Sequence, residues 1–592
     1  MSWPILTVVL LLPLAGAITI ALIPADRRRA IRAVSISTTA ATLGLAVVLL
    51  VAFYALPNPS SSRLSGSVQG QSLHQVLSPI TFQFQEQVGW LGSLGNLGAA
   101  APTLDQGNNT VDQAAPPPIN FTYHLGADGL SVWLVALAAL LFLIAALALR
   151  RREGMVRSFA ILMCVSEVGV LGVLLSLDLV LFYFFWEAAL IPLYFLLLGF
   201  GGERRGPAAL KFMIYTVAGS LFMLLAILGA YFIGGAQTGI YTFDLPTQIL
   251  IQTSVHASHP TTLTLFGHVL RFLTPQQWLF CAFALAFAIK IPLVPLHTWL
   301  PDAYESGSTA FLVFFAGIVS KLGAFGFIRY CLPLFPGPSH TFQPVLMALG
   351  VTSILYGALM ALREVDLKRT IGYASISHLG FIVLGIFSLD VDGLNGAILQ
   401  MVNHGVIICG LFLCAGMLEA RFQTRDRRQL AGLAGSMPVF AGLFLVIALA
   451  GLGMPLLSSF VGEFLTLLGA FEVAPAWAVA AGLGTILACW YMLRLYQGVM
   501  QGRAPAPGAA GQRDLGPLEV ALLAPLVALI AVIGVFPEPV IHDTRFSANQ
   551  YIIAADRGVV PTPARPAARR AARPAALPAA RPDAAVSGPP VR

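Results

Sequence analysis

The sequence predicts an all-α polytopic membrane protein with about 14 transmembrane helices. Hydrophobic residues occupy 57% of the 592 positions and charged residues only 10%, whereas about 25% of a typical soluble domain is charged. The mean hydropathy is +0.81, and apolar runs of about 20 residues, long enough to cross a bilayer, recur along nearly the whole chain. A soluble globular protein is therefore excluded, and one helical bundle in a membrane is expected.

The individual spans follow from these apolar runs, with approximate ends. The first run contains the small residues of "LLPLAGA", as a cleaved signal peptide does, but no basic region precedes it and the run is long, so we expect a retained helix. The expected spans, in chain order, are 3–23, 33–56, 128–149, 158–176, 179–200, 208–233, 277–300, 308–331, 344–362, 371–388, 394–418, 437–466, 474–498 and 517–536.

Basic residues in alternate loops predict the orientation of the bundle, because short basic loops stay in the cytoplasm. One set of loops contains "DRRRAIR", "RRREGMVR", "GERRG", "REVDLKR", "RFQTRDRR" and "GQRDLG". The other set is nearly free of lysine and arginine, with Arg329 expected at a helix end on that side. Both termini are thus expected on the outer face. The net charge of +7 reflects these loops and the basic tail, so no nucleic-acid partner is expected.

Three regions outside the spans carry little chemical information. The outer loop 57–127 is long and polar, and the tail 562–592 is a Pro/Ala/Arg-rich extension expected to be disordered. A second outer loop, 234–276, contains His256, His259 and His268 without a nearby cysteine or carboxylate, so we expect no metal site there. The six cysteines lack metal-ligand or disulfide spacing and are expected to be packing residues.

The informative residues are ionisable side chains inside the spans. A charge at the centre of a bilayer costs about 2.5–3.5 kcal/mol on insertion scales, so such residues face the bundle interior and usually mark an ion or proton route. The candidates for proton transfer are Glu187, Lys290, Lys321, His378, His404 and Glu463, with Glu167 as a weaker member.

Each candidate also has a structural interpretation. Glu187 and Lys290 could form a static buried ion pair, although such pairs usually stabilise a fold less than apolar packing does. His378 and His404 could be neutral imidazoles bonded to core carbonyls. For Glu167 a position at a helix end or at the lipid interface is favoured. Six ionisable groups in one bundle are nevertheless hard to explain by packing alone.

Prolines and glycines interrupt two of the spans beside these candidates. Pro292 and Pro295 follow Lys290 and leave the carbonyls of Ala288 and Ile291 without their helical donors, which breaks the helix. In the segment "GLGMPLLSSFVGEF", Gly451, Gly453 and Pro455 do the same before Glu463.

Interrupted helices in corresponding positions of two halves indicate an inverted-repeat transporter. We therefore expect two inverted five-helix repeats, 158–331 and 344–498, with the discontinuous helix fourth in each. Residues 1–56 hold two further helices, residues 128–157 a third helix with its cytoplasmic loop, and 517–536 the last helix.

Five motifs together resemble a known family. They are "FYFFWEAALIPLYFLLLGFGG", "AIKIPLVPLHTWLPDAYESGSTA", "GIVSKLGAFGFIRY", "DLKRTIGYASISHLGFI" and "GLGMPLLSSFVGEFL". They are similar to the antiporter-like subunits of respiratory complex I, the proton-pumping NADH-quinone oxidoreductase. The similarity covers about 1–56 and 128–540. The motif around Lys290 is shared with cation/proton antiporters, whereas Glu463, where several relatives carry lysine, favours complex I. The loop 57–127 and the tail are atypical and inherit nothing from the family.

The resemblance implies a role for each candidate. Glu187 would pair with Lys290 as a charge switch, and Lys321 would be the central proton carrier. His378 and His404 would relay protons through bound water, and Glu463 would connect the path to the outer face. Burial disfavours the charged form of lysine and glutamate alike, which suits groups that exchange protons.

The resemblance also implies partners and a location. The chain would act as a translocase subunit in a bacterial inner membrane, beside neighbouring antiporter-like subunits. It contains no nucleotide-binding, iron–sulfur or flavin motif, so flavin, iron–sulfur clusters and quinone are expected in partner subunits. Two alternatives remain open: a subunit of a multi-subunit cation/proton antiporter, and a membrane subunit of an energy-converting hydrogenase or ferredoxin-linked relative.

Overall fold

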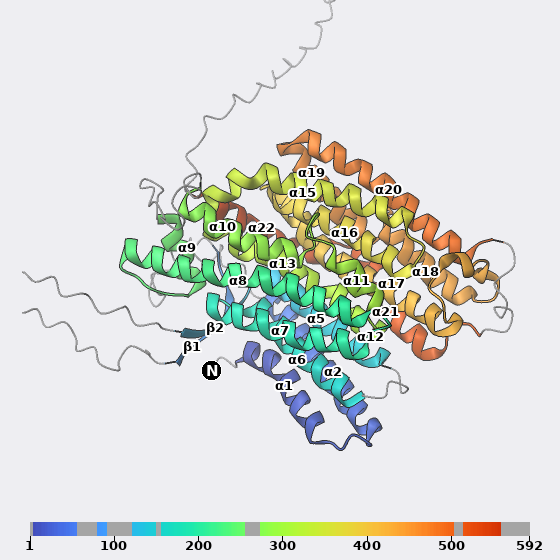
Figure 1. The fold of residues 1–592 in the computed structure, drawn as a ribbon. Helices are drawn as coiled ribbons and strands as arrows, with labels where there is room; N and C mark the ends of the chain where they lie inside the picture. The colour runs from blue at the N-terminus through green and yellow to red at the C-terminus, as the bar shows by residue number, and fades with distance from the viewer. Residues whose placement is uncertain are drawn as a thin grey trace, which may run out of the picture. The chain divides into compact units, whose positions relative to one another are not determined.

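The computed structural model describes residues 4–55, 80–91, 121–149, 156–254, 273–502 and 513–557 (Figure 1). The expectations for most of the loop 57–127, for His256, His259 and His268, and for the tail 562–592 lie outside these residues. The described part is a bundle of long helices, as predicted.

Twelve helices of the described part are long and apolar enough to cross a membrane. This finding supports a multi-pass membrane protein. Their bounds are α1 (Ile5–Leu22), α2 (Arg28–Ala55), α5 (Gly129–Ala148), α6 (Val156–Leu175), α7 (Leu179–Phe200), α8 (Arg205–Thr238), the composite helix Thr309–Leu334, α15 (Pro336–Arg363), α16 (Leu367–Ile386), α17 (Val391–Phe422), α20 (Pro475–Met500) and α21 (Pro517–Val535).

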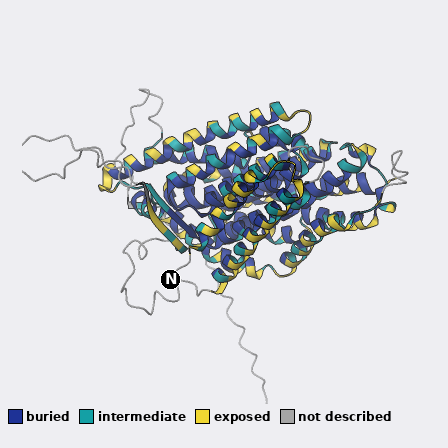
Figure 2. Ribbon diagram, turned by 90° about the horizontal axis from the view of Figure 1, so that it is seen from below, coloured by how far each residue is buried: buried dark blue, intermediate teal, exposed yellow. Residues whose placement is uncertain are grey.

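Burial separates a central group of helices from a peripheral one. In Thr309–Leu334 and α17, the most apolar stretch of 18 residues is completely buried. In α2, α20 and α21, most residues of the corresponding stretch are not buried. Figure 2 shows the same division, with exposed residues along the outer sides of the helices and buried residues between them. The exposed sides carry large apolar residues, as lipid-facing surfaces do.

Both predicted interruptions are present. The first separates α10 (Pro275–Lys290) from α11 (Trp299–Ser306), and the second separates α18 (Pro438–Gly451) from α19 (Ser458–Val473). The expectation that the Ala288 carbonyl would lack a donor needs correction, because it accepts from the Leu293 amide at 2.9 Å. The Leu449 carbonyl likewise accepts from the Met454 amide at 3.1 Å. Each break thus begins with a bond to the fifth residue instead of the fourth.

The span expected as a plain helix at 308–331 contains two π-helical turns. It runs through α12 (Thr309–Phe314), η2 (Phe315–Val319), α13 (Ser320–Gly326), η3 (Phe327–Cys331) and α14 (Leu332–Leu334). A π turn inserts one residue into the helix and redirects backbone carbonyls, and such turns are frequent at functional sites. Apolar composition does not distinguish a π turn from an α turn, so the sequence did not indicate them.

Several elements outside the spans were also not predicted. The strands β1 (Gln83–Leu91) and β2 (Phe121–Ala127), both within the polar outer loop, pair antiparallel, so the fold is not purely helical. Glu86 of β1 accepts hydrogen bonds from the amides of Leu6 and Thr7 at 2.8 and 3.1 Å, where the first turn of α1 has free donors. The short helix α9 (Leu245–Ser254) lies in the second outer loop.

A further helix, α22 (Glu538–Asp556), follows the last predicted span. Its mixed polar sequence gave no membrane signal, yet it packs against α5 and α17. The Tyr551 hydroxyl donates to Asp128 at 2.6 Å, and the Thr544 hydroxyl donates to Asn395 at 2.5 Å. Specific hydrogen bonds, which hydropathy does not detect, therefore hold this helix against the bundle.

Candidate functional site

Lys290 is the last residue of α10 and its side chain is buried. Its ammonium lies over the ring of Trp186, 5.1 Å from the centroid, and 5.9 Å from that of Phe212. A cation at a helix C-terminus is favoured by the helix dipole, and aromatic faces give it a weak further attraction. The break after α10 is fixed by the Trp299 indole, which donates to the Ile289 carbonyl at 2.9 Å.

Glu187 lies in the middle of α7, one residue after Trp186. Its charge acts on Lys290 through space, but the two side chains do not form a direct ion pair among the contacts of the described residues. In this structure the Lys290 ammonium contacts the aromatic rings, and Glu187 acts on it from a greater distance than a salt bridge. One Glu187 carboxylate oxygen is buried without a hydrogen-bond partner in the described part.

Lys321 occupies the first turn of α13, between the two π turns, and is completely inaccessible to solvent. Its ammonium donates to the Ala316 carbonyl at 2.8 Å and lies 3.4 Å from the Ser320 hydroxyl oxygen. The π turn η2 presents that carbonyl to the lysine. The sequence of its own segment, 309–334, contains no Asp or Glu to balance this charge.

Two helices approach unusually closely beside the lysines. A Cβ atom on Gly323 would lie 2.7 Å from the Phe287 carbonyl oxygen and 2.8 Å from a side-chain carbon of Ile291. Only glycine allows α13 to pack this tightly on the end of α10. This contact brings the segments that carry Lys321 and Lys290 together.

His404 is a buried histidine in the second half of the bundle. It lies in α17, and both its ring nitrogens are buried without a protein hydrogen-bond partner in the described part. The charges of Lys321 and His378 both act on it, and its ring centroid is 5.6 Å from that of His378. Buried nitrogens of this kind require bound water, so His404 is suited to a water-mediated step. Its alternative role, bonding to a core carbonyl, receives no support from these contacts.

His378 and Glu463 form a hydrogen-bonded cluster around the second break. The His378 Nδ1 atom lies 3.0 Å from Glu463 Oε1, and its Nε2 atom lies 3.3 Å from the Tyr491 hydroxyl. The same carboxylate oxygen accepts from Gln400 at 3.1 Å and from Ser459 at 3.0 Å. The sequence did not single out Tyr491, Gln400 or Ser459. Only their contact with a buried acid identifies them.

Glu167 requires a correction. A helix-end or interfacial position was favoured for it, but it lies in the middle of α6 and is completely buried. Both its carboxylate oxygens lack a hydrogen-bond partner in the described part. The surrounding sequence "CVSEVGVLG" is as apolar as a lipid-facing helix, so sequence alone did not distinguish the two positions.

Arg329 lies near the C-terminal end of the composite helix Thr309–Leu334, as expected. It is completely buried in η3 and donates to Asp128 at 2.6 Å. The rings of Phe325 and Phe82 lie 4.8 and 5.0 Å from its guanidinium carbon. This ion pair lies inside the bundle, at the end that also contains β1, β2 and α22.

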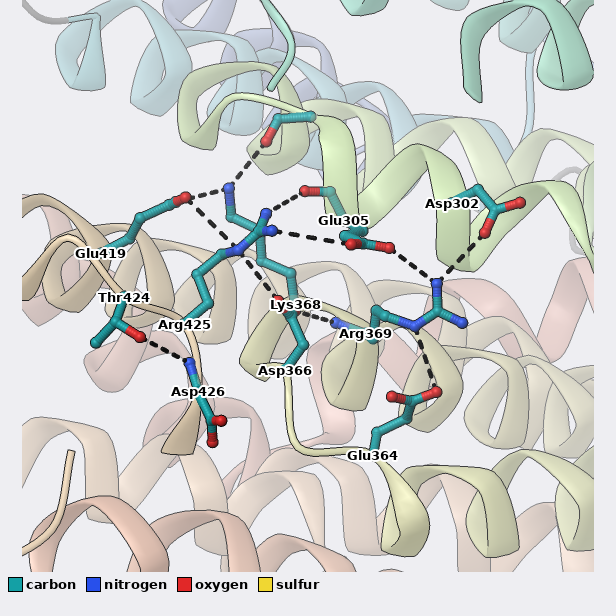
Figure 3. A network of polar contacts seen from close by, with 11 residues as sticks. Asp302, Glu305, Glu364, Asp366, Lys368, Arg369, Glu419, Thr424, Arg425 and Asp426 are labelled. Atoms are coloured by element: carbon teal, nitrogen blue, oxygen red, sulfur yellow. Dashed lines mark hydrogen bonds and ion pairs between the residues drawn. The ribbon is translucent and has the colours of Figure 1, made fainter. Parts of the chain in front are cut away.

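The opposite end of the bundle, where the basic loops lie, contains a cavity of about 1120 Å³. Its lining includes Lys368, Glu419 and Ser308. The Lys368 ammonium is buried, donates to the Gly307 carbonyl at 3.0 Å and lies 2.7 Å from Glu419 Oε2. Figure 3 shows the surrounding network, in which Arg425 lies between Glu419 and Glu305.

Hydroxyl groups extend from this cavity toward Lys321. The Ser308 hydroxyl, which lines the cavity, and the Tyr304 hydroxyl, one turn earlier in the chain, are both buried without a full hydrogen bond in the described part. The Tyr304 hydroxyl faces those of Ser375 and Ser320. Ser320 in turn contacts the Lys321 ammonium.

Among the described residues no group of three or more His, Cys, Asp or Glu side chains is arranged to hold a metal ion. The buried groups described above are acids, bases and hydroxyls, all of which can exchange protons. They form a row of buried ionisable groups that passes both helix breaks.

Comparisons with known proteins identify the family of the chain. Residues 176–488 match the family model described as NADH:quinone oxidoreductase/Mrp antiporter, TM. The chain is 36% identical over 474 residues to NADH-quinone oxidoreductase subunit M of Rickettsia prowazekii, covering 80% of this chain and 87% of that protein. It is 40% identical over 438 residues to subunit M of Pseudomonas aeruginosa, covering 72% of this chain and 81% of that protein.

Two solved structures have a similar fold. A chain of respiratory complex I from Thermus thermophilus superposes with a TM-score of 0.73 at 30% identity, over 93% of this chain and 99% of that chain. A chain of the Mrp complex from Dietzia sp. DQ12-45-1b superposes with a TM-score of 0.70 at 21% identity, over 94% of this chain and 100% of that chain. The second similarity shows the fold alone. The matched family model and the extent of the subunit M similarity lead to one assignment: the chain belongs to the NADH:quinone oxidoreductase/Mrp antiporter family and, within it, to the subunit M group.

Proposed function

We propose that this chain translocates protons as a membrane subunit of NADH-quinone oxidoreductase, driven by electron transfer in partner subunits. The observation that carries the proposal is the row of buried ionisable groups from Lys290 through Lys321, His404 and His378 to Glu463. Charges buried in a membrane bundle are costly, and a row of them is characteristic of proton routes.

The two broken helices complete the proposed architecture. Joined across their breaks, α10 with α11 and α18 with α19 would add two spans to the twelve continuous ones. Each break then falls in the fourth of five successive spans, counted from α6 and from α15. This order supports two inverted repeats at about 158–331 and 344–498, with a shared ion path between them.

Each site residue has a role in this proposal. Lys290 holds its proton while Glu187 is near and releases it when the two charges separate. Lys321, which has no neighbouring acid, loads and unloads most readily. His404 and His378 pass the proton on through bound water, and Glu463 delivers it toward the outer face.

The cavity at the end with the basic loops is the proposed entrance for protons. Water can fill a space of about 1120 Å³, and Glu419 beside Lys368 provides a carboxylate that collects protons from it. The hydroxyls of Tyr304 and Ser320 then lead to Lys321.

The basic loops support an orientation with this entrance in the cytoplasm and with both termini outside a bacterial inner membrane. Flavin, iron–sulfur clusters and quinone would reside in partner subunits, among them neighbouring antiporter-like membrane subunits. This chain's own residues would then move protons only.

The test replaces Lys321 by arginine in the intact complex. Arginine keeps the positive charge but does not release its proton in a protein. We expect Lys321→Arg to abolish most NADH-driven proton pumping into membrane vesicles, while NADH oxidation with an artificial acceptor continues at the parental rate. Lys211→Arg, at a half-exposed lysine bonded to Asp302, is the matched control and should pump normally. Parental pumping by Lys321→Arg would mean that Lys321 is only a structural charge.

A further inference from the structure

A second, smaller pocket lies beside the C-terminal end of α20, on the side of the basic loops. Its volume is about 410 Å³, and it opens widely to the surface. Three arginines line it, Arg427 and Arg428 from the loop after α17 and Arg494 from α20, together with Gln497 and Gln501. None of these residues belongs to the proposed proton path.

The positive charge of this pocket is incompletely balanced within the described part of the chain. Arg428 is bound to Asp426, with 2.6 Å between Nη2 and Oδ2. Among the described residues, Arg494 donates only to the Leu362 carbonyl, at 3.1 Å. Arg427 is 8% exposed, and its Nε atom is buried without a hydrogen-bond partner among the described residues. Burial and the charge of Arg494 hold the pKa of Arg427 below its usual value. The positive charges of Arg427 and Arg494 thus act on each other, and the nearest carboxylate, Asp426, is already bound to Arg428.

The larger cavity shows that this imbalance is specific to the small pocket. There Lys368 is bound to Glu419, and Arg421 forms an ion pair with Glu519. Arg425 contacts Asp366 and Glu419. Those cations already have carboxylate partners, whereas neither Arg427 nor Arg494 forms an ion pair with a carboxylate among the described residues, so both are available to an external anion.

An exposed apolar stripe of α20 runs directly into the small pocket. Its spacing of three and four residues places it on one face of the helix. Arg494 and Gln497 continue the same face into the pocket. From Val479 to Arg494 the stripe extends for about 22 Å at 1.5 Å per residue, long enough for an acyl chain of one leaflet, which spans about 15 Å. Its apolar members are Val479, Leu483, Ile486, Trp490 and Leu493.

We propose that Arg427 and Arg494 bind the phosphate of an anionic phospholipid whose acyl chain lies along this stripe of α20. Guanidinium groups bind phosphate oxygens through paired, charge-assisted hydrogen bonds. A free phosphate ion would use the arginines but not the apolar stripe, so the stripe favours the lipid. With the orientation proposed above, the site faces the cytoplasmic leaflet, where basic pockets between transmembrane helices bind anionic head groups.

The test uses the intact complex in lipid nanodiscs that contain phosphatidylglycerol with a photoreactive acyl chain. After irradiation, mass spectrometry of the peptides should locate the label on residues 479–493. Arg427→Gln and Arg494→Gln should each reduce this label about tenfold, as expected for the loss of a charge-assisted contact. Arg204→Gln, at an exposed arginine on the same side of the bundle, should not change it. Arg427→Lys, which keeps the charge, should retain part of the label if Arg427→Gln fails to assemble.

Three results would overturn the proposal. Photoreactive phosphatidylcholine could label the stripe as strongly as phosphatidylglycerol does, with no effect of the arginine variants. Inorganic phosphate could displace the label completely, which would identify a site for a free anion. Alternatively, α20 could cross-link to a neighbouring subunit and acquire no lipid label. The proton path has its own test, the pumping measurement with Lys321→Arg. A negative result for lipid binding therefore does not bear on the proton path.

Discussion

The two helix breaks hold their ionisable groups in different ways. At the first break, Lys290 lies over aromatic rings and one oxygen of nearby Glu187 has no protein partner in the described part. At the second, a single oxygen of Glu463 accepts hydrogen bonds from three side chains, those of Ser459, Gln400 and His378. Similar backbone interruptions thus support a loosely held charge pair in one half and a closely bonded cluster in the other.

This difference separates two tasks that a coupled proton route needs. A weakly bonded pair changes its separation at little cost, so a small conformational change alters the charge interaction strongly. A fully bonded cluster keeps its geometry and offers a fixed proton pathway. Under the proposed function, we therefore expect the first break to switch and the second to conduct protons.

The largest effect should follow from removing the switch. Glu187→Gln and Lys290→Ala should each lower NADH-driven proton pumping about 10²-fold, the scale of a lost proton-transfer group, while the complex still assembles. Proton uptake by inverted membrane vesicles measures this effect, and the amount of assembled complex serves as the control. If an assembled variant pumps normally, the first break is not a switch and the comparison fails.

A smaller effect, on stability, should distinguish the two breaks directly. Glu463→Ala removes the acceptor that Ser459, Gln400 and His378 share, and should cost about 1–3 kcal/mol of unfolding free energy. Glu187→Ala should cost clearly less, because its carboxylate satisfies no protein donor among the described contacts. Thermal unfolding of the purified complex, monitored by the cleavage of this chain by a protease, gives the loss of stability for each variant. Equal losses would show that the apparent difference in bonding has no energetic meaning.

The backbone of the second break allows a finer test. Gly453 has a φ of +78°, and a Cβ atom there would lie 2.9 Å from Glu463 Oε2. Gly453→Ala should therefore strain the turn by about 1–2 kcal/mol and displace the carboxylate, lowering pumping several-fold. Gly442→Ala in α18, where a Cβ meets nothing within 4 Å, is the control. Unchanged pumping in Gly453→Ala would show that the position of Glu463 is not critical.

The smallest effect concerns Asp244, a hydrogen-bonded carboxylate in the second outer loop. His124 Nδ1 lies 2.7 Å from Asp244 Oδ1. Although burial raises the pKa of Asp244, its bond to His124 and the charge of that ring hold it below the usual 3.8. A lowered folded-state pKa adds stability above the unfolded value, and this stability is lost as the pH falls through the folded-state pKa. Asp244→Asn should flatten the decline in melting temperature below about pH 4. If the melting temperature of the variant falls as steeply as that of the parent, Asp244 does not cause the loss of stability at low pH.

The sequence predicted the features that depend on hydropathy and on backbone chemistry. Both helix breaks were predicted because proline lacks an amide hydrogen, and the candidate residues were found because charges are rare in apolar spans. The cluster around Glu463 was only half predicted, since Tyr491 and Gln400 are ordinary residues until the fold brings them to the acid.

Other features depend on tertiary contacts that no local pattern encodes. Glu167 was assigned to an interface because its neighbours suit lipid and a protein core equally well. Helix α22 was missed because side-chain hydrogen bonds, not hydropathy, hold it in place. The strands β1 and β2 lie far apart in a polar loop, and only their pairing makes them recognisable.

The π turns around Lys321 have a consequence for sequence comparison. Each contains one residue more than an α turn, so it rotates the following residues by about 100° relative to an uninterrupted helix. Over Thr309–Leu334 the two turns accumulate to about 200°, and a helical wheel drawn for the whole segment assigns its two ends to the wrong sides. Deletion of one residue within Phe315–Val319 would restore α-helical phase locally and rotate Lys321 away from Ala316 and Ser320. In this segment the number of residues, as much as their identity, determines where the central lysine points.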